Sequence, residues 1–245
     1  MSQPVTFERD GAVATITLNA PATHNALTPR MLCLLADAVV RFADDDRLRV
    51  AVITGAGEKS FCSGGDLALT LPLMTGARLP QDDWDHRLLA DPLVLAASGL
   101  RGFPLDKPVI AAINGTCMAA GFEMMLGTDI RVAASHARFG LPEVKHALIP
   151  FAGSIARLPR QLPWPLAMEL MLTGEAITAQ RALEASLVNH VVAPADLMPR
   201  AREIAERIAR NGPLAVRAVK RVAAASSGRA LDAAYALSDP AKALV

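Results

Sequence analysis

Apolar and polar residues alternate near the start of the chain, and this pattern predicts two strands, at residues 5–9 and 12–19. The dipeptide Asp10-Gly11 lies between them and is typical of a tight hairpin turn. The apolar run at residues 108–114 indicates a buried strand. Similar short runs predict further strands at residues 49–54, 129–133 and 188–192.

The segments between these strands carry apolar residues at helical spacing. Helices are predicted at residues 28–42, 82–100, 119–126, 165–172, 178–186, 197–210, 213–225 and 229–237. Thr28 and Pro29 suit the start of the first helix, because threonine caps helices well and proline fits the first helical position. Residues 68–80 show no clear period, and Pro92 weakens the helical pattern of its segment.

Strands that alternate with helices indicate an α/β architecture. We expect one α/β body at residues 1–192, followed by a helical region at residues 193–245. No repeat, low-complexity tract or obvious linker divides the chain. The helices of the second region carry more apolar residues than one small face needs, which favours assembly into an oligomer.

The composition excludes several classes of protein. The 245 residues include 25 Lys and Arg against 24 Asp and Glu, so the net charge of +1 gives no reason to bind nucleic acid or an anionic membrane. No run of about 18 apolar residues indicates a transmembrane helix, and the first residues lack the pattern of a signal peptide. Cys33, Cys62 and Cys117 form no CxxC motif, and the histidines show no metal-ligand spacing. We therefore expect a cytoplasmic protein with no metal site, no membrane association and no nucleic-acid partner.

One of the predicted strands is followed by the glycine-rich loop Ser63-Gly64-Gly65-Asp66-Leu67. Paired glycines let the backbone approach a ligand closely, so the N–H of Gly65 is available as a hydrogen-bond donor. The loop lacks the Gly-Lys-Ser/Thr of a phosphate-binding P-loop and the GxGxxG of a dinucleotide site. Taken alone, it also fits a tight turn from strand to helix.

A second segment, residues 114–123, runs from the end of a buried strand through small residues into a helix. The first N–H groups of a helix are unpaired and lie at the positive end of its dipole, so the N–H of Ala120 is poised to hold an anion. Glu123 follows about one helical turn later, so that a donor and a carboxylate face the same cavity. The alternative for Glu123 is a carboxylate that is favoured only by the helix dipole.

Glu143 is the second candidate carboxylate. It follows a rigid turn at residues 139–142, and taken alone it also fits an exposed loop glutamate. Two carboxylates in one buried site shift their pKa values apart, so that one acts as an acid and the other as a base. Together with two backbone donors for an oxyanion, this set suits a thioester whose carbonyl becomes an enolate.

These segments together resemble the enoyl-CoA hydratase/isomerase family, the crotonase superfamily, and the resemblance covers nearly the whole chain. Beside the opening strand pair, it rests on the ordered motifs His24-Asn25-Ala26-Leu27, Gly64-Gly65-Asp66, Ala112-Ile113-Asn114-Gly115, Leu172-Thr173-Gly174-Glu175 and Leu187-Val188-Asn189. The resemblance implies an α/β fold, a crotonase-like spiral of ββα units with a C-terminal helical appendage. It also implies a homotrimer or a dimer of trimers, with the helices after residue 195 at the interface.

By similarity, the N–H groups of Gly65 and Ala120 form an oxyanion hole, and Glu123 and Glu143 match the two catalytic glutamates of the hydratases. Position 120 is more often glycine in this family. The resemblance also implies contacts to coenzyme A and the acyl chain from His24, Ala26, Ser63, Gly64, Asp66, Leu67, Met118 and Phe151. Phe151 stands where hydratases usually have glycine, and its bulk is expected to reshape the acyl pocket.

The expected activity is a lyase reaction, the syn hydration of a trans-2-enoyl-CoA to a 3-hydroxyacyl-CoA. Coenzyme A is then part of the substrate, and no separate cofactor is expected. The first alternative is Δ3,Δ2-enoyl-CoA isomerisation, which needs only one proton shuttle. Thioester hydrolysis, C–C bond cleavage and dehydration of carnitinyl-CoA also stay open. A non-catalytic RNA-binding relative is disfavoured by the near-neutral charge and the lack of a Lys-rich helix.

Overall fold

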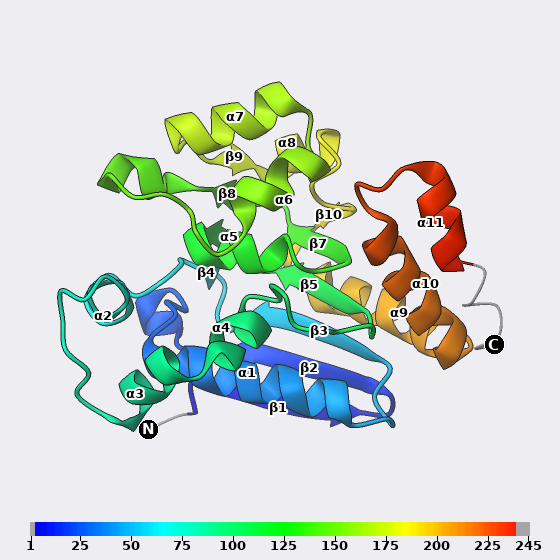
Figure 1. The fold of residues 1–245 in the computed structure, drawn as a ribbon, viewed down its shortest axis with the longest axis horizontal. Helices are drawn as coiled ribbons and strands as arrows, with labels where there is room; N and C mark the ends of the chain where they lie inside the picture. Colours follow the sequence, from blue (N-terminus) through cyan, green and yellow to red (C-terminus); the bar gives the residue numbers. More distant parts are fainter. Residues whose placement is uncertain (1–2, 239–245) are drawn as a thin grey trace.

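The computed structural model describes residues 3–238 of the chain (Figure 1). Within these residues the strands form two sheets, and helices surround both of them. None of the helices in this part is long and apolar enough to cross a membrane. The last residues of the predicted helical region, 239–245, lie outside the described part.

The larger sheet has the strand order β1-β2-β3-β5-β7-β10. Its strands are β1 Val5–Asp10, β2 Val13–Leu18, β3 Val50–Gly55, β5 Val109–Ile113, β7 Ile130–Ala134 and β10 His190–Val192. The hairpin of β1 and β2 turns at Gly11, whose φ of 58° favours glycine. All other neighbours in this sheet are parallel. The strands predicted from the sequence are therefore confirmed, with ends that shift by one or two residues.

The smaller sheet has the strand order β4-β6-β8-β9. Its strands are β4 Ser60–Cys62, β6 Thr116–Met118, β8 Arg138–Gly140 and β9 Ile177–Thr178. They are too short to produce a periodic pattern, so the sequence does not predict them. Each of β4, β6 and β8 follows a strand of the larger sheet and precedes a helix. The chain thus repeats strand, strand and helix, and the expected ββα organisation is confirmed.

The helices are α1 Pro29–Asp44, α2 Thr70–Met74, α3 Asp83–Ala90, α4 Pro92–Ser98, α5 Ala119–Met125, α6 Ser154–Gln161, α7 Trp164–Thr173, α8 Ala179–Glu184, α9 Leu197–Ala209, α10 Pro213–Ser226 and α11 Leu231–Ser238. The single helix predicted at residues 82–100 was wrong, because the segment forms α3 and α4. Pro92 begins α4, and the side chain of Asp91 accepts a hydrogen bond from the N–H of Leu93 at 3.0 Å. The pattern also predicts neither α2 nor α6.

Helices cover both faces of the larger sheet (Figure 1). Side chains alternate along β3, so that Ala51 and Ile53 join the core that includes α1, whereas Val50 and Val52 face α9. The residues of α9 in this second core are Leu197, Ala201, Ile204 and Ala205. The first helix of the predicted C-terminal region therefore packs directly on the sheet.

Helices α10 and α11 extend beyond the sheet, at the opposite side of the molecule from α2 and α3 (Figure 1). An ion pair between Lys220 and Asp129, 2.7 Å long, ties α10 to the body. Leu214 and Val219 on α10 are 59% and 70% exposed. The domain division after residue 192 and the assembly into trimers stay predictions.

Candidate active site

Strands β4, β6 and β8 are parallel neighbours, so their carboxyl ends lie at one edge of the smaller sheet. The glycine-rich loop at residues 63–67 follows β4, and α5 with Ala120 and Glu123 follows β6. A 3₁₀ turn at Pro142–His146, which contains Glu143, follows β8. The sheet thus brings together the three segments that the sequence indicates as candidates for chemistry (Figure 1).

The glycine-rich loop and the start of α5 are in direct contact. A Cβ atom on Gly64 would lie 2.6 Å from the Cβ of Ala119 and 3.5 Å from the backbone nitrogen of Ala120. A Cβ atom on Gly121 would lie 2.6 Å from the Cβ of Cys62. Because a distance of 2.6 Å leaves no room for a side chain, the two glycines allow the two segments to approach this closely.

Two backbone donors remain free where these segments meet. Gly64 accepts a hydrogen bond from the N–H of Leu27 at 2.8 Å, and Asp66 donates to Leu27 at 3.1 Å. This pairing leaves the N–H of Gly65 without a partner among the described residues. Ala120 lies in the first turn of α5, where backbone N–H groups have no partner within the helix.

Gly65 and Ala120 both line a cavity of about 380 Å³. The cavity extends toward α1, α2 and α4, and its lining includes Leu27, Leu32, Thr70, Met74, Pro92, Leu95, Ala96, Met124 and Ala152. The left-handed residue of the turn into α5 is Ala119, with a φ of 50°, and Ala120 itself does not adopt a positive φ. An alanine is therefore compatible with the donor position at residue 120.

Glu123 is 2% exposed and is held by one residue of α6. Its Oε1 accepts hydrogen bonds from the backbone N–H of Ser154 at 2.9 Å and from the hydroxyl of Ser154 at 2.8 Å. Ser154 is fully buried. Two donors on one oxygen hold the carboxylate in a fixed orientation. The sequence analysis did not find Ser154, because no short motif connects it to Glu123.

Glu143 has a different environment. Its Oε2 is buried and has no hydrogen-bond partner among the described residues. The pKa of Glu143 is raised to about 7, mainly by burial and in smaller part by the nearby charge of Glu123, against a backbone hydrogen bond that lowers it. The exposed loop glutamate considered as an alternative is therefore wrong, since Glu143 is partly buried and senses Glu123.

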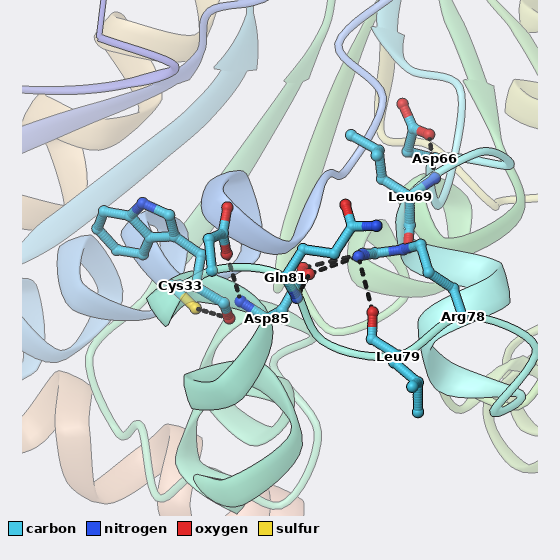
Figure 2. Close-up of polar contacts among 9 residues, drawn as sticks. Cys33, Asp66, Leu69, Arg78, Leu79, Gln81 and Asp85 are labelled. Atoms are coloured by element: carbon cyan, nitrogen blue, oxygen red, sulfur yellow. Dashed lines mark hydrogen bonds and ion pairs between the residues drawn. The ribbon is translucent and has the colours of Figure 1, made fainter.

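Asp66 organises the loop that follows it (Figure 2). Its Oδ1 accepts hydrogen bonds from the N–H groups of Ala68 at 2.9 Å and Leu69 at 2.8 Å. Arg78 donates to the carbonyl of Leu69 at 2.9 Å and forms a two-bond ion pair with Asp85. The hydrogen bonds from Arg78 lower the pKa of Asp85. These contacts fix one wall of the cavity, and they give Asp66 a structural role.

The segment around His24 reaches the glycine-rich loop. The carbonyl of His24 accepts a hydrogen bond from the N–H of Ser63 at 3.1 Å, and its ring Nδ1 lies 2.9 Å from the hydroxyl of Ser60. His24 is exposed and Ala26 is half-buried. Asn25 between them is fully buried, and its amide donates to the carbonyl of Ser60 at 2.8 Å. The sequence analysis missed this role of Asn25.

The remaining predicted contact residues separate into two groups. Phe151 lines the cavity and is 51% exposed. Leu67 is 66% exposed, and neither Leu67 nor Met118 is part of the cavity lining. Of these three residues, the structure brings only Phe151 to the cavity that Gly65 and Ala120 line.

Within residues 3–238, no group of three His, Cys, Asp or Glu side chains is arranged to hold a metal ion. Cys62 and Cys117 lie beside the two donor segments and are fully buried. Burial raises the pKa of the Cys62 thiol to about 12 and raises that of Cys117 well above its usual value. Both residues therefore remain protonated packing residues.

Comparison with known proteins identifies the family. The family model described as enoyl-CoA hydratase/isomerase matches residues 8–239. The chain belongs to the enoyl-CoA hydratase/isomerase family. Carnitinyl-CoA dehydratase of Salmonella arizonae is 37% identical to it over 235 residues, which cover 96% of this chain and 85% of that protein.

Solved structures of the enoyl-CoA hydratase/isomerase family share the fold. Enoyl-CoA hydratase from Bacillus anthracis matches with a TM-score of 0.88 and 34% identity, over 99% of this chain and 91% of that chain. Carnitinyl-CoA hydratase from Mycobacterium avium matches with a TM-score of 0.79 and 41% identity, over 91% of this chain and 81% of that chain. The resemblance inferred from the motifs and the crotonase-like fold that it implies are both confirmed.

Proposed function

We propose that this chain adds water to the double bond of a trans-2-enoyl-CoA and forms a 3-hydroxyacyl-CoA. One observation supports this function best. Two unpaired backbone N–H groups, of Gly65 and Ala120, line one cavity, and two carboxylates of opposite environment, Glu123 and Glu143, lie next to the donor segments. Membership of the enoyl-CoA hydratase/isomerase family supports the same class of reaction.

In the proposed reaction, the thioester oxygen accepts hydrogen bonds from Gly65 and Ala120. These donors stabilise the negative charge that develops on this oxygen as the thioester becomes an enolate. Withdrawal of electrons makes the β-carbon electrophilic, so that it is open to attack by water. Because the donors belong to a fixed backbone, little reorganisation accompanies the reaction.

The two carboxylates divide the proton transfers. Glu123, held in place by the two donors of Ser154, takes a proton from water while the water oxygen bonds to the β-carbon. Glu143 has a pKa of about 7, so about half of it carries a proton at neutral pH, and this proton goes to the α-carbon as the enolate collapses. One O–H bond of water and the O–H bond of Glu143 break, one O–H bond on Glu123, one C–O and one C–H bond form, and the carbonyl is restored. Proton exchange with solvent then returns both carboxyl groups to their starting states.

Further substrate contacts belong to the same proposal. His24, Ala26, Ser63 and Gly64 lie along the segments that border the donors and are proposed to contact coenzyme A. Phe151 is proposed to contact the acyl chain from the cavity wall. Leu67 and Met118, whose side chains lie outside this lining, are retained only as contacts to coenzyme A. The mechanism requires no separate cofactor.

Dehydration of carnitinyl-CoA is the second candidate, because relatives with 37% identity have that name. It is the same chemistry on a different acyl group, run in the direction that removes water. Isomerisation is a weaker candidate, since a single proton shuttle would leave one of Glu123 and Glu143 without a role.

A panel of acyl-CoA thioesters tests the proposal. A trans-2-enoyl-CoA loses absorbance at the band of the conjugated thioester when it is hydrated, whereas a 3-enoyl-CoA gains this absorbance when it is isomerised. We expect loss of absorbance with 2-enoyl substrates and formation of the 3-hydroxyacyl product. Activity on 3-enoyl substrates alone would replace hydration by isomerisation.

A further inference from the structure

The cavity that Gly65 and Ala120 line has a mostly apolar lining. Among its lining residues, Arg101 is the only one with an ionisable side chain. Ser98 lines the same cavity, is 3% exposed, and has a buried hydroxyl without a hydrogen-bond partner among the described residues. A buried hydroxyl without a partner is costly, so Ser98 gains a hydrogen bond if its hydroxyl turns toward a ligand in the cavity.

The backbone fixes Arg101 close to Ser98. Helix α4 ends at Ser98, Leu100 adopts a left-handed φ of 48°, and the N–H of Arg101 donates to the carbonyl of Ala96 at 2.9 Å. The guanidinium then donates to the carbonyl of Phe151 on the opposite side. The turn after α4 therefore places Ser98 and Arg101 together in the lining of this cavity.

The charge of Arg101 is not neutralised within the described residues, where it forms no ion pair with a carboxylate. A second guanidinium, of Arg157, lies nearby, and the side chains of both arginines approach Gly153. Arg157 donates to the carbonyls of Leu100 and Gly99. Burial and then the charge of Arg101 lower the pKa of Arg157. The charge of Glu123 acts on Arg157 in the opposite direction, and Arg157 is not part of the cavity lining. Arg101 is therefore the group in the lining that attracts an anion.

We propose that the acyl group of the natural substrate ends in a carboxylate, which Arg101 and the hydroxyl of Ser98 recognise. The inference rests on the proposed function, because it takes the cavity beside the two N–H donors as the acyl pocket. Arg101 is exposed, so the carboxylate keeps some of its hydration when it binds. The same cation repels the quaternary ammonium of a carnitinyl group, so this chain differs in acyl specificity from the relatives with that name.

Two pairs of probes with equal chain length test the inference on the full chain. The first pair, trans-2-hexenedioyl-CoA and trans-2-hexenoyl-CoA, compares kcat/KM for hydration. The second pair, adipoyl-CoA and hexanoyl-CoA, has no double bond and compares Kd by calorimetry. We expect a preference of about 10- to 100-fold for the carboxylate member of each pair, as a hydrogen bond to a charged group contributes that much.

Three variants test whether Arg101 and Ser98 cause the preference for the carboxylate probes. Arg101→Met keeps an unbranched side chain without the charge, and it brings the ratio of kcat/KM in the first pair and the ratio of Kd in the second pair close to one. Arg101→Lys retains a part of the preference. Ser98→Ala lowers both ratios by less than Arg101→Met does. The matched control is Arg160→Met, which changes another exposed arginine outside the cavity and leaves both ratios unchanged.

The outcomes separate the two proposals. Hydration of trans-2-hexenoyl-CoA without any preference for the carboxylate probe would overturn the inference and leave the proposed function intact. Preferential binding of adipoyl-CoA through Arg101 without hydration of either enoyl probe would overturn the proposed function and leave the inference intact. An equal effect of Arg101→Met on both members of a pair would also overturn the inference, since it would show a general structural role.

Discussion

The region around Glu123 and the region around Glu143 are built in opposite ways, although both contribute a carboxylate to one site. Glu123 lies on α5 and receives two hydrogen bonds from a fully buried serine. Glu143 lies in a short 3₁₀ turn and has a buried oxygen without a partner. The difference shows how two neighbouring carboxyl groups can have unlike environments, because Glu123 receives hydrogen bonds whereas burial raises the pKa of Glu143.

Replacement of each glutamate by glutamine is the strongest test of this comparison. Glu123→Gln and Glu143→Gln keep the shape of the side chain and remove proton transfer, so each is expected to lower turnover by about 10²–10⁴-fold. Glu143→Gln should also abolish the loss of activity above pH 7 that deprotonation of Glu143 causes in the parent protein. Full hydratase activity in folded Glu143→Gln would show that a single carboxylate suffices.

The comparison also assumes a thioester oxygen held by the two backbone donors. Gly65→Pro removes one N–H and should lower turnover by roughly 10²–10³-fold, the usual loss for one such donor. Gly65→Ala is the matched control, since a Cβ at this position has no neighbour within 4 Å and the N–H is retained. We expect it to lose less than tenfold.

Proline at position 120 is the less suitable test of the second donor. Ala119 has a left-handed φ of 50°, and a following proline disfavours such conformations. A folded Gly65→Pro variant with normal turnover, measured beside Gly65→Ala, would place the thioester oxygen elsewhere.

Ser154→Ala tests the Glu123 side of the comparison. The variant loses the hydroxyl donor and keeps the backbone donor, so turnover should fall by about tenfold with little change in KM. Ser135→Ala, at an exposed position, is the control. An unchanged turnover in folded Ser154→Ala would limit Ser154 to packing.

The smallest expected effect is on the contribution of the Glu143 carboxyl to the stability of the folded chain. The pKa of this carboxyl is raised from 4.5 to about 7, so the folded chain binds more protons than the unfolded chain between these pH values. Its contribution to the free energy of unfolding therefore falls as the pH rises through this window. Glu143→Gln lacks this loss. The Tm of the variant minus the Tm of the parent should therefore increase from pH 4.5 to about 7. A constant difference in Tm would show that the carboxyl titrates normally.

Much of the fold follows from the sequence, and the exceptions have physical causes. The buried strands and the long helices have a clear period, whereas β9 has only two residues, too few for any period. Residues 82–100 have a helical composition, but Pro92 has no N–H to continue a helix and begins a new one.

The candidate site also has residues that the sequence predicts and one that it does not. Gly65, Ala120, Glu123 and Glu143 stand in recognisable motifs, and the smaller sheet brings their segments together. Ser154 is 31 residues from Glu123, and only the folded chain makes them neighbours. Two residues that are so far apart in the sequence produce no recognisable local spacing pattern.

The contact between Gly121 and Cys62 has a consequence for the evolution of this enzyme. A methyl group at position 121 would meet the side chain of Cys62 at 2.6 Å and its backbone oxygen at 2.8 Å. The first contact is to the Cβ of Cys62, so only glycine at position 62 removes it, and the contact to the backbone oxygen remains even then. Strand β4 itself therefore has to move, and the loop with Gly65 moves with it. A substitution at Gly121 is therefore expected to displace the proposed oxyanion donor Gly65, although Gly121 itself is not among the proposed substrate contacts. Change at this pair of positions during evolution requires a shift of β4.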